Sequence, residues 1–143
     1  MFQRRPDRLG FLLLNVFGEI NHHRTGAAGL DDIIQSVDGS LAAMIMAYDG
    51  IAIDEVSVEI SEFDIPLMSV EYAAVLKEIK RAVDVIKIGG LEEVSITTAR
   101  ICVAVRILTD DYFAVLILNR DGNIGKGRYM LQLKSFEIQR ELS

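Results

Sequence analysis

An Asp-Gly pair, Asp49-Gly50, separates two apolar runs that cover residues 41–48 and 51–60. Asp-Gly between apolar runs is the strongest short-range signal for a β-hairpin, because both central residues of a type I′ turn need positive φ. The apolar positions of the second run change phase, which predicts a β-bulge near Asp54-Glu55. The hairpin commits the chain to an antiparallel sheet.

A long amphipathic helix is expected from Ser69, as its N-cap, to Ile88, just before Gly89-Gly90. Its apolar stripe contains Tyr72, Val75, Leu76, Ile79, Val83 and Ile86. Further apolar residues widen this surface beyond one stripe: Val70, Ala74, Val85 and Ile88. One stripe is enough to cover a sheet, so the helix is predicted to bury a second side. The stripe residues are our candidates for a homodimer interface.

The rest of the chain divides into shorter elements. Leu30, Ile33, Ile34 and Val37 predict a short helix that stops at Asp38-Gly39. Three strands are expected after the long helix, at residues 91–98, 101–108 and 112–118. Residues 129–133 would also suit a strand, but we expect a final helix over 124–142. The predicted order is helix, hairpin, long helix, three strands, helix.

Residues 1–28 follow none of these patterns. Apolar residues around Leu12 and Val16 could form a short amphipathic helix, and residues 25–29 resemble a linker. The apolar run 11–17 is short for a secretory signal, and Gly18-Glu19 interrupts it. We therefore expect an N-terminal appendage over 1–28 that can remain mobile, and one domain over 29–143.

Composition excludes several kinds of partner. The formal charge is −6, and the one near-cluster of arginines (Arg4, Arg5 and Arg8) is interrupted by Asp7, so no nucleic-acid partner is expected. Cys102 is the only cysteine, and no disulfide can form within the chain, which fits the reducing cytoplasm. No apolar stretch approaches the ~20 residues of a membrane span.

No set of residues with enzymatic chemistry is apparent. Residues 122–127 superficially resemble a phosphate-binding loop, but the Gly spacing and the Ser or Thr of that motif are missing, so a strand-to-helix turn is expected. His22 and His23 are the only histidines, and as neighbours in the sequence they point in different directions on a helix; with no second cysteine a zinc site is not expected, and no distinctive serine lies near them. The acidic pairs 31–32, 92–93 and 110–111 suit solvated edges. We expect no catalytic residue, cofactor or metal.

Two stretches resemble the Roadblock/dynein-light-chain family, including its bacterial MglB-like members. The first is residues 37–53, where a helix ends and an Asp-Gly hairpin follows. The second is Phe113–Leu118 followed by Ile124–Arg128. The resemblance covers residues 30–142. It implies an α/β (α+β) fold in which a five-stranded, mostly antiparallel sheet carries the long helix on one face and the terminal helices on the other.

The same resemblance implies a homodimer, formed through the long helix and the adjacent third strand, that binds a Ras-like small GTPase. Such a dimer would activate GTP hydrolysis or serve as an adaptor. Each of Arg100, Arg106, Arg120 and Arg128 could act as an arginine finger, and the sequence does not select one. The alternative is a free-standing signalling or scaffold module that binds a small molecule or another protein and has no GTPase partner.

Overall fold

The structure, a computed structural model, describes residues 20–22, 29–58 and 62–142. In chain order the elements are β1 (Ile20–His22), α1 (Gly29–Ser36), β2 (Ser40–Ala47), β3 (Ala52–Val58), α2 (Ile65–Ile86), β4 (Glu93–Thr97), β5 (Ile101–Ile107), β6 (Tyr112–Asn119) and α3 (Ile124–Leu142). Within the described ranges, no helix is long and apolar enough to cross a membrane.

The strands form one antiparallel sheet in the order β1-β3-β2-β6-β5-β4. Its five longer strands, β2 to β6, are those predicted from the sequence. A sixth short strand, β1, pairs with β3 and comes from the segment predicted as an appendage. Residues 1–19 and 23–28 lie outside the described residues. The domain boundary at residue 28 therefore stays a prediction.

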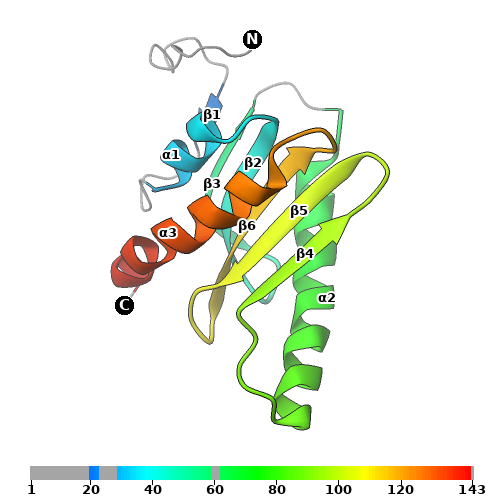
Figure 1. The fold of residues 1–143 in the computed structure, drawn as a ribbon. Coiled ribbons are helices and arrows are strands. Elements are labelled where there is room, and N and C mark those ends of the chain that lie inside the picture. Colours follow the sequence, from blue (N-terminus) through cyan, green and yellow to red (C-terminus); the bar gives the residue numbers. More distant parts are fainter. Residues whose placement is uncertain (1–19, 23–28, 59–61, 143) are drawn as a thin grey trace.

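The helices cover both faces of the sheet, as the sequence predicted: α2 lies on one face, and α1 and α3 on the other (Figure 1). The α2-side core includes Met44, Phe113, Ile117, Ala73 and Leu76. The opposite core includes Leu30, Ile33, Leu116, Leu131 and Ile138. Because helices cover both faces, the central strands β2 and β6 are apolar along most of their length.

The start of α2 differs from the prediction. Asp64, not Ser69, is the N-cap: its side chain accepts a hydrogen bond from Leu67 N at 3.1 Å, and Pro66 occupies the first turn. Ser69 lies inside the helix and is buried, with its Oγ 2.9 Å from the carbonyl oxygen of Ile65. The helix therefore begins four residues before the predicted N-cap, and it includes Pro66.

The β2–β3 hairpin is confirmed, but its turn is not type I′. Asp49 does not have positive φ, whereas Gly50 has φ 92° and donates its N–H to Ala47 O at 3.0 Å. This is a type I turn followed by a left-handed glycine, which also suits the strand twist. The predicted bulge is present, since the register shifts next to the Ile45–Asp54 pair and leaves one extra residue in β3.

Candidate protein-interaction surface

The inner face of α2 is anchored only along its first half. Its buried residues are Ile65, Ser69, Ala73 and Leu76, and none of the residues after Leu76 is fully buried. In Figure 1 the C-terminal part of α2 extends beyond the ends of the neighbouring strands. The helix ends where Lys87 adopts φ 61° and donates its N–H to Val83 O.

The structure separates the six stripe residues predicted for a dimer interface. Leu76 is only 3% exposed and faces the sheet. Tyr72, Ile79 and Val83 are half-buried. Val75 and Ile86 are 48% and 61% exposed. The stripe is therefore partly core and partly surface.

The residues that widen the stripe are largely uncovered. Val70, Val85 and Ile88 are 52%, 67% and 71% exposed. They lie among charged residues: Arg81, which pairs with Glu78, is one turn before Val85 and so shares its side of the helix. Val75 and Ile86 lie on a different side of the helix from Val85, so the two groups of exposed apolar residues are separate.

The edge strand β4 contributes apolar side chains to the face of the sheet that α2 covers. Val94 and Ile96 are half-buried and pack against the α2-side core, as Tyr72 does. Glu93 points to the opposite face, where it pairs with Arg128 of α3. We call Tyr72, Val75, Ile79 and Ile86 of α2, together with Val94 and Ile96 of β4, the α2–β4 surface.

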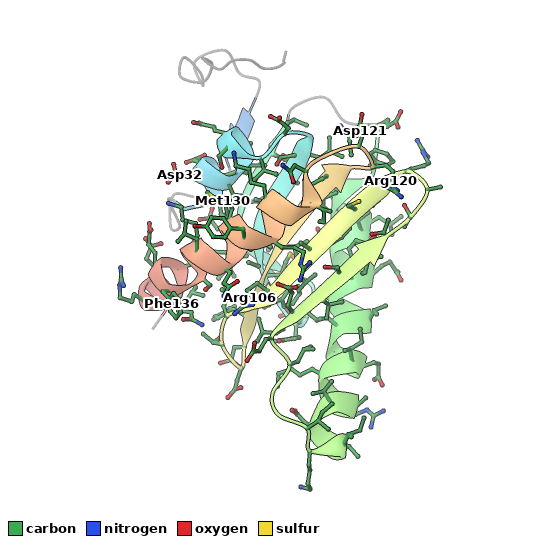
Figure 2. All side chains as sticks on the ribbon, viewed as in Figure 1. Asp32, Arg106, Arg120, Asp121, Met130 and Phe136 are labelled. Atoms are coloured by element: carbon green, nitrogen blue, oxygen red, sulfur yellow. The ribbon has the colours of Figure 1, made fainter. Side chains whose placement is uncertain are left out.

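The arginines named as possible arginine fingers occupy different places. Arg106 and Arg128 both pair with Glu93, at 3.7 Å and 2.8 Å, between the sheet and α3. Arg100 pairs with Glu62 at 2.7 Å. Arg120 is exposed in the turn after β6, next to Asp121 (Figure 2). The structure does not bring the four together.

The glycine-rich turn before α3 is occupied by its own chain. Gly122 lies so close to Gly39 that a Cβ on Gly39 would be 2.7 Å from Gly122 Cα. Asn123 donates its N–H to Asp38 O at 3.1 Å, and its side chain accepts from Lys126 N. The turn is thus packed against the α1–β2 connection, as a strand-to-helix turn would be.

The remaining candidate groups are dispersed. Cys102 is buried in β5, and His22 lies in β1, while His23 falls outside the described residues. Asp32 pairs with Lys134 at 3.0 Å and raises the pKa of that lysine. In the part of the chain that the structure describes, no three His, Cys, Asp or Glu side chains gather as metal ligands.

An open depression lies between α2 and the β2–β3 and β5–β6 turns, beside Tyr48. The Tyr48 hydroxyl is buried, and no described group forms a hydrogen bond with it. Burial, with smaller effects of Asp110, Asp111 and Asp84, raises the pKa of Tyr48 to about 12. The phenol is therefore neutral at physiological pH and is not a nucleophile there.

Sequence reasoning missed a second apolar surface, on the outer face of α3. Tyr129, Leu133 and Phe136 are 61%, 51% and 67% exposed. Their spacing of four and then three residues places them on one side of the helix. That spacing is visible in the sequence, but the sequence does not show that Leu131 and Ile138, and not these three residues, face the sheet.

Neither a family profile nor a curated protein matches the sequence. Among solved structures, the chain is similar to MglC from Myxococcus xanthus, with 36% identity over 79% of this chain and 95% of that one and a TM-score of 0.59. The fold is also shared with a Roadblock/LC7 domain from Streptomyces avermitilis (13% identity, 80% and 94% covered, TM-score 0.66). An MglB with a tetrameric arrangement has the fold too (11% identity, 79% and 84% covered, TM-score 0.70). The chain therefore belongs to the Roadblock/LC7 family, as its sequence predicted.

Proposed function

We propose that this Roadblock protein is a cytoplasmic, non-catalytic homodimer that regulates a Ras-like small GTPase or serves as its adaptor. The α2–β4 surface is the observation that carries the proposal. Val75 and Ile86 are solvated in a single chain, on a helix whose inner face already covers the sheet. Contiguous apolar surface of this kind marks protein interfaces.

A second copy of the chain is the partner expected to bury the α2–β4 surface. A two-fold axis places the same patch of both chains in contact, so one apolar surface serves both partners. The edge strand β4 lies at the border of the sheet, where the partner's β4 could approach. The similarity to MglC and to an MglB in a tetrameric arrangement supports self-association.

The family and the residues of this chain support the regulatory role. Catalysis of phosphoryl transfer needs a phosphate cradle, a bound metal or a positioned base. The glycine turn at 122–127 is packed against Asp38 and Gly39 and does not provide that cradle. A protein of this kind acts by binding one conformation of the GTPase more tightly than the other, which shifts the population of its switch segments.

Two measurements test the proposal. The first is capture of a small GTPase by the full chain in the presence of GTP and GDP analogues, where nucleotide-dependent capture is expected. The second is single-turnover GTP hydrolysis by that GTPase, with and without the protein. Unchanged hydrolysis would leave the adaptor role, and absence of nucleotide-dependent capture would favour the module without a GTPase partner.

Arginine variants then separate the two ways of accelerating hydrolysis. Arg120→Ala is the most informative, because Arg120 is exposed in a turn, whereas Arg106 and Arg128 hold Glu93. Loss of acceleration with binding intact in one variant would identify an arginine finger. Acceleration retained in Arg100→Ala and in the other three variants would support repositioning of the GTPase's own residues.

A further inference from the structure

The outer face of α3 carries a row of exposed apolar side chains, which we call the α3 stripe: Tyr129, Leu133 and Phe136. The opposite side of the helix is buried on the sheet through Gly127, Leu131, Ser135 and Ile138. Figure 2 shows Phe136 on the outside of the molecule, near the C-terminal end of α3. The α3 stripe is therefore not needed to hold the helix in place.

Two residues of opposite charge lie beside the stripe. Lys126 precedes Tyr129 by three residues, and Glu137 follows Leu133 by four, so both border the same apolar row. Eleven residues separate Lys126 from Glu137, which is about three helical turns, so the two charges lie on one line along α3, about 16 Å apart. Among the described residues, neither of them forms a salt bridge.

Other charged residues of α3 are already engaged within the chain. Arg128 and Lys134 form salt bridges with residues of β4 and α1. The hydrogen bond and charge of Asp32 raise the pKa of Lys134, and the charge of Glu137 adds a smaller effect. Arg140 also has an interaction within its own chain. The border of the stripe thus offers a partner one positive and one negative charge.

A second copy of α3, running antiparallel, matches this pattern. The midpoint between Lys126 and Glu137 and the midpoint between Tyr129 and Phe136 are about 1.5 Å apart along the helix axis, and Leu133 lies next to both. A two-fold axis at this point would place Lys126 against Glu137 of the second copy and Tyr129 against Phe136 of the second copy. Leu133 would meet its own equivalent on the axis. One axis therefore satisfies the charges and the apolar row together.

Other arrangements fit the charges less well. A parallel pair would bring Lys126 against Lys126 and Glu137 against Glu137, and like charges across an interface oppose binding. A partner with charges of one sign would be matched at one end of the stripe and opposed at the other. In the antiparallel pair, Arg140 would lie opposite Gly125 of the second copy, which has no side chain and only Asn123 Oδ1 nearby.

A recess lies beside the C-terminal end of the stripe. It is lined by Leu108, Thr109, Phe136, Gln139 and Arg140. The Gln139 side chain donates to Leu108 O at 2.7 Å, which holds the β5–β6 turn against α3. Because Tyr129 of the second copy would lie against Phe136, its ring could enter this recess. The two-fold axis fills the recess of both copies in the same way.

We propose that the α3 stripe is a self-association surface, at which two copies of this chain pack through antiparallel α3 helices. Three apolar side chains per copy cover far less than the ~1,600 Å² of a standard interface, so we expect a dissociation constant of about 0.5 mM. Since α3 and α2 lie on opposite faces of the sheet, one chain can use the α3 stripe and the α2–β4 surface together. The α3 contact would then link the proposed dimers to one another where the protein is concentrated.

The test uses the full chain with Ile86→Asp, so that the α2–β4 surface does not contribute to association. Sedimentation equilibrium from about 0.05 to 1 mM should show a reversible rise in mass from one chain toward two. Leu133→Asp should abolish this rise, because it brings two carboxylates together on the two-fold axis. Ile51→Asp, which changes an exposed apolar residue of the β2–β3 turn, is the matched control and should leave the rise unchanged.

Exchange of the two charges tests the pairing. Lys126→Glu alone and Glu137→Lys alone should each weaken association by about threefold or more, because each places like charges opposite one another at two symmetric positions. The double variant Lys126→Glu, Glu137→Lys should restore the affinity, since it re-forms both pairs with the signs exchanged. Circular dichroism confirms that each variant is folded.

Disulfide formation reports the direction of the helices. An antiparallel pair places residue 126 near residue 137 of the second copy, so a mixture of Lys126→Cys and Glu137→Cys chains should cross-link on mild oxidation. Each variant alone should cross-link much less. Cys102 is buried and is left in place.

Four results would overturn the proposal. They are a constant mass up to about 1 mM, an unchanged rise in Leu133→Asp, a double charge variant as weak as the single ones, and cross-linking of each cysteine variant with itself only. Phe136-dependent co-sedimentation with phosphatidylserine vesicles, or loss of GTPase capture in Leu133→Asp, would in the absence of a mass rise assign the stripe to a membrane or to the GTPase. Because Ile86→Asp is present throughout, failure of the proposed dimer does not affect the outcome.

Discussion

Gly127 of α3 lies directly against Leu116 of β6: a Cβ atom on Gly127 would be 2.7 Å from Leu116 Cδ2. Leu116 is fully buried, so its side chain has little room to give way. The missing side chain is what lets α3 lie close to the sheet. This glycine serves packing within the helix, although its sequence context suggested only an entry turn.

Replacing Gly127 with leucine should therefore destabilise the domain by about 2 kcal/mol or more, since added core volume forces side chains and backbone to shift. Gly125→Ala is the control, because only Asn123 Oδ1, at 3.7 Å, lies near its position. Urea unfolding of both variants measures the difference. Equal midpoints would show that the sheet accommodates the larger side chain.

Tyr48→Phe should stabilise the protein at neutral pH by about 1 kcal/mol. The variant removes a buried hydroxyl to which no described group is hydrogen-bonded, and it keeps the ring, which packs 5.0 Å from the Phe113 ring. Thermal unfolding at pH 7 measures the gain. A loss of stability would mean that the hydroxyl has a partner in solution.

The same tyrosine predicts a loss of stability at high pH. Burial raises the folded pKa of Tyr48 to about 12, above the 10.0 of an unfolded tyrosine. As the pH rises, the unfolded chain loses the Tyr48 proton before the folded chain does. The stability that depends on the protonated phenol is therefore complete below pH 10 and is lost between pH 10 and 12. Tyr48→Phe should remove that part of the pH dependence of stability. In a titration followed by phenolate absorbance, the variant should show one tyrosine fewer that ionises above the usual pKa.

The sequence predicted the elements of the sheet well, because their periodicity is local. Strands β5 and β6 and the final helix appear at or within a residue of their expected bounds. The start of α2 was wrong because Asp64 and Ser69 can both cap a helix, and Pro66 fits either a loop or a first turn. Sequence alone does not choose between them.

The α2–β4 surface was predicted less completely, because it depends on how α2 packs on the sheet. Periodicity assigns Leu76 and Val75 to one stripe, but the position of the sheet decides which of them is covered, and it buries Leu76. Strand β1 was missed because three residues show no period, and its pairing with β3 joins segments far apart in sequence. The spacing of Tyr129, Leu133 and Phe136 on one side of α3 can be recognised in the sequence. Their exposure could not be predicted, because it depends on which side of α3 packs on Leu116.

Deleting residues 1–28 should leave a cooperatively folding domain. The deletion removes β1, which pairs with β3 through only three residues at the edge of the sheet, whereas both apolar cores lie within residues 30–142. Urea unfolding of the shortened chain, compared with one that begins at residue 20 and keeps β1, measures the effect. Loss of cooperative unfolding in the shorter chain alone would make β1 part of the domain.

An acidic residue on the exposed side of α2 should convert the proposed homodimer to a monomer. Val75 and Ile86 are 48% and 61% exposed in a single chain, so Val75→Asp or Ile86→Asp costs the isolated fold little. In a dimer closed through the α2–β4 surface, the same change buries an unpaired carboxylate and so opposes association. Light scattering at about 100 µM, well above the dissociation constant of a stable interface, should report a halved mass for these variants.

Ile51→Asp, an exposed apolar position on the β2–β3 turn, is the matched control and should stay dimeric. A monomeric unmodified protein at this concentration would contradict the dimer, and a dimer that persists in both α2 variants would place its interface elsewhere.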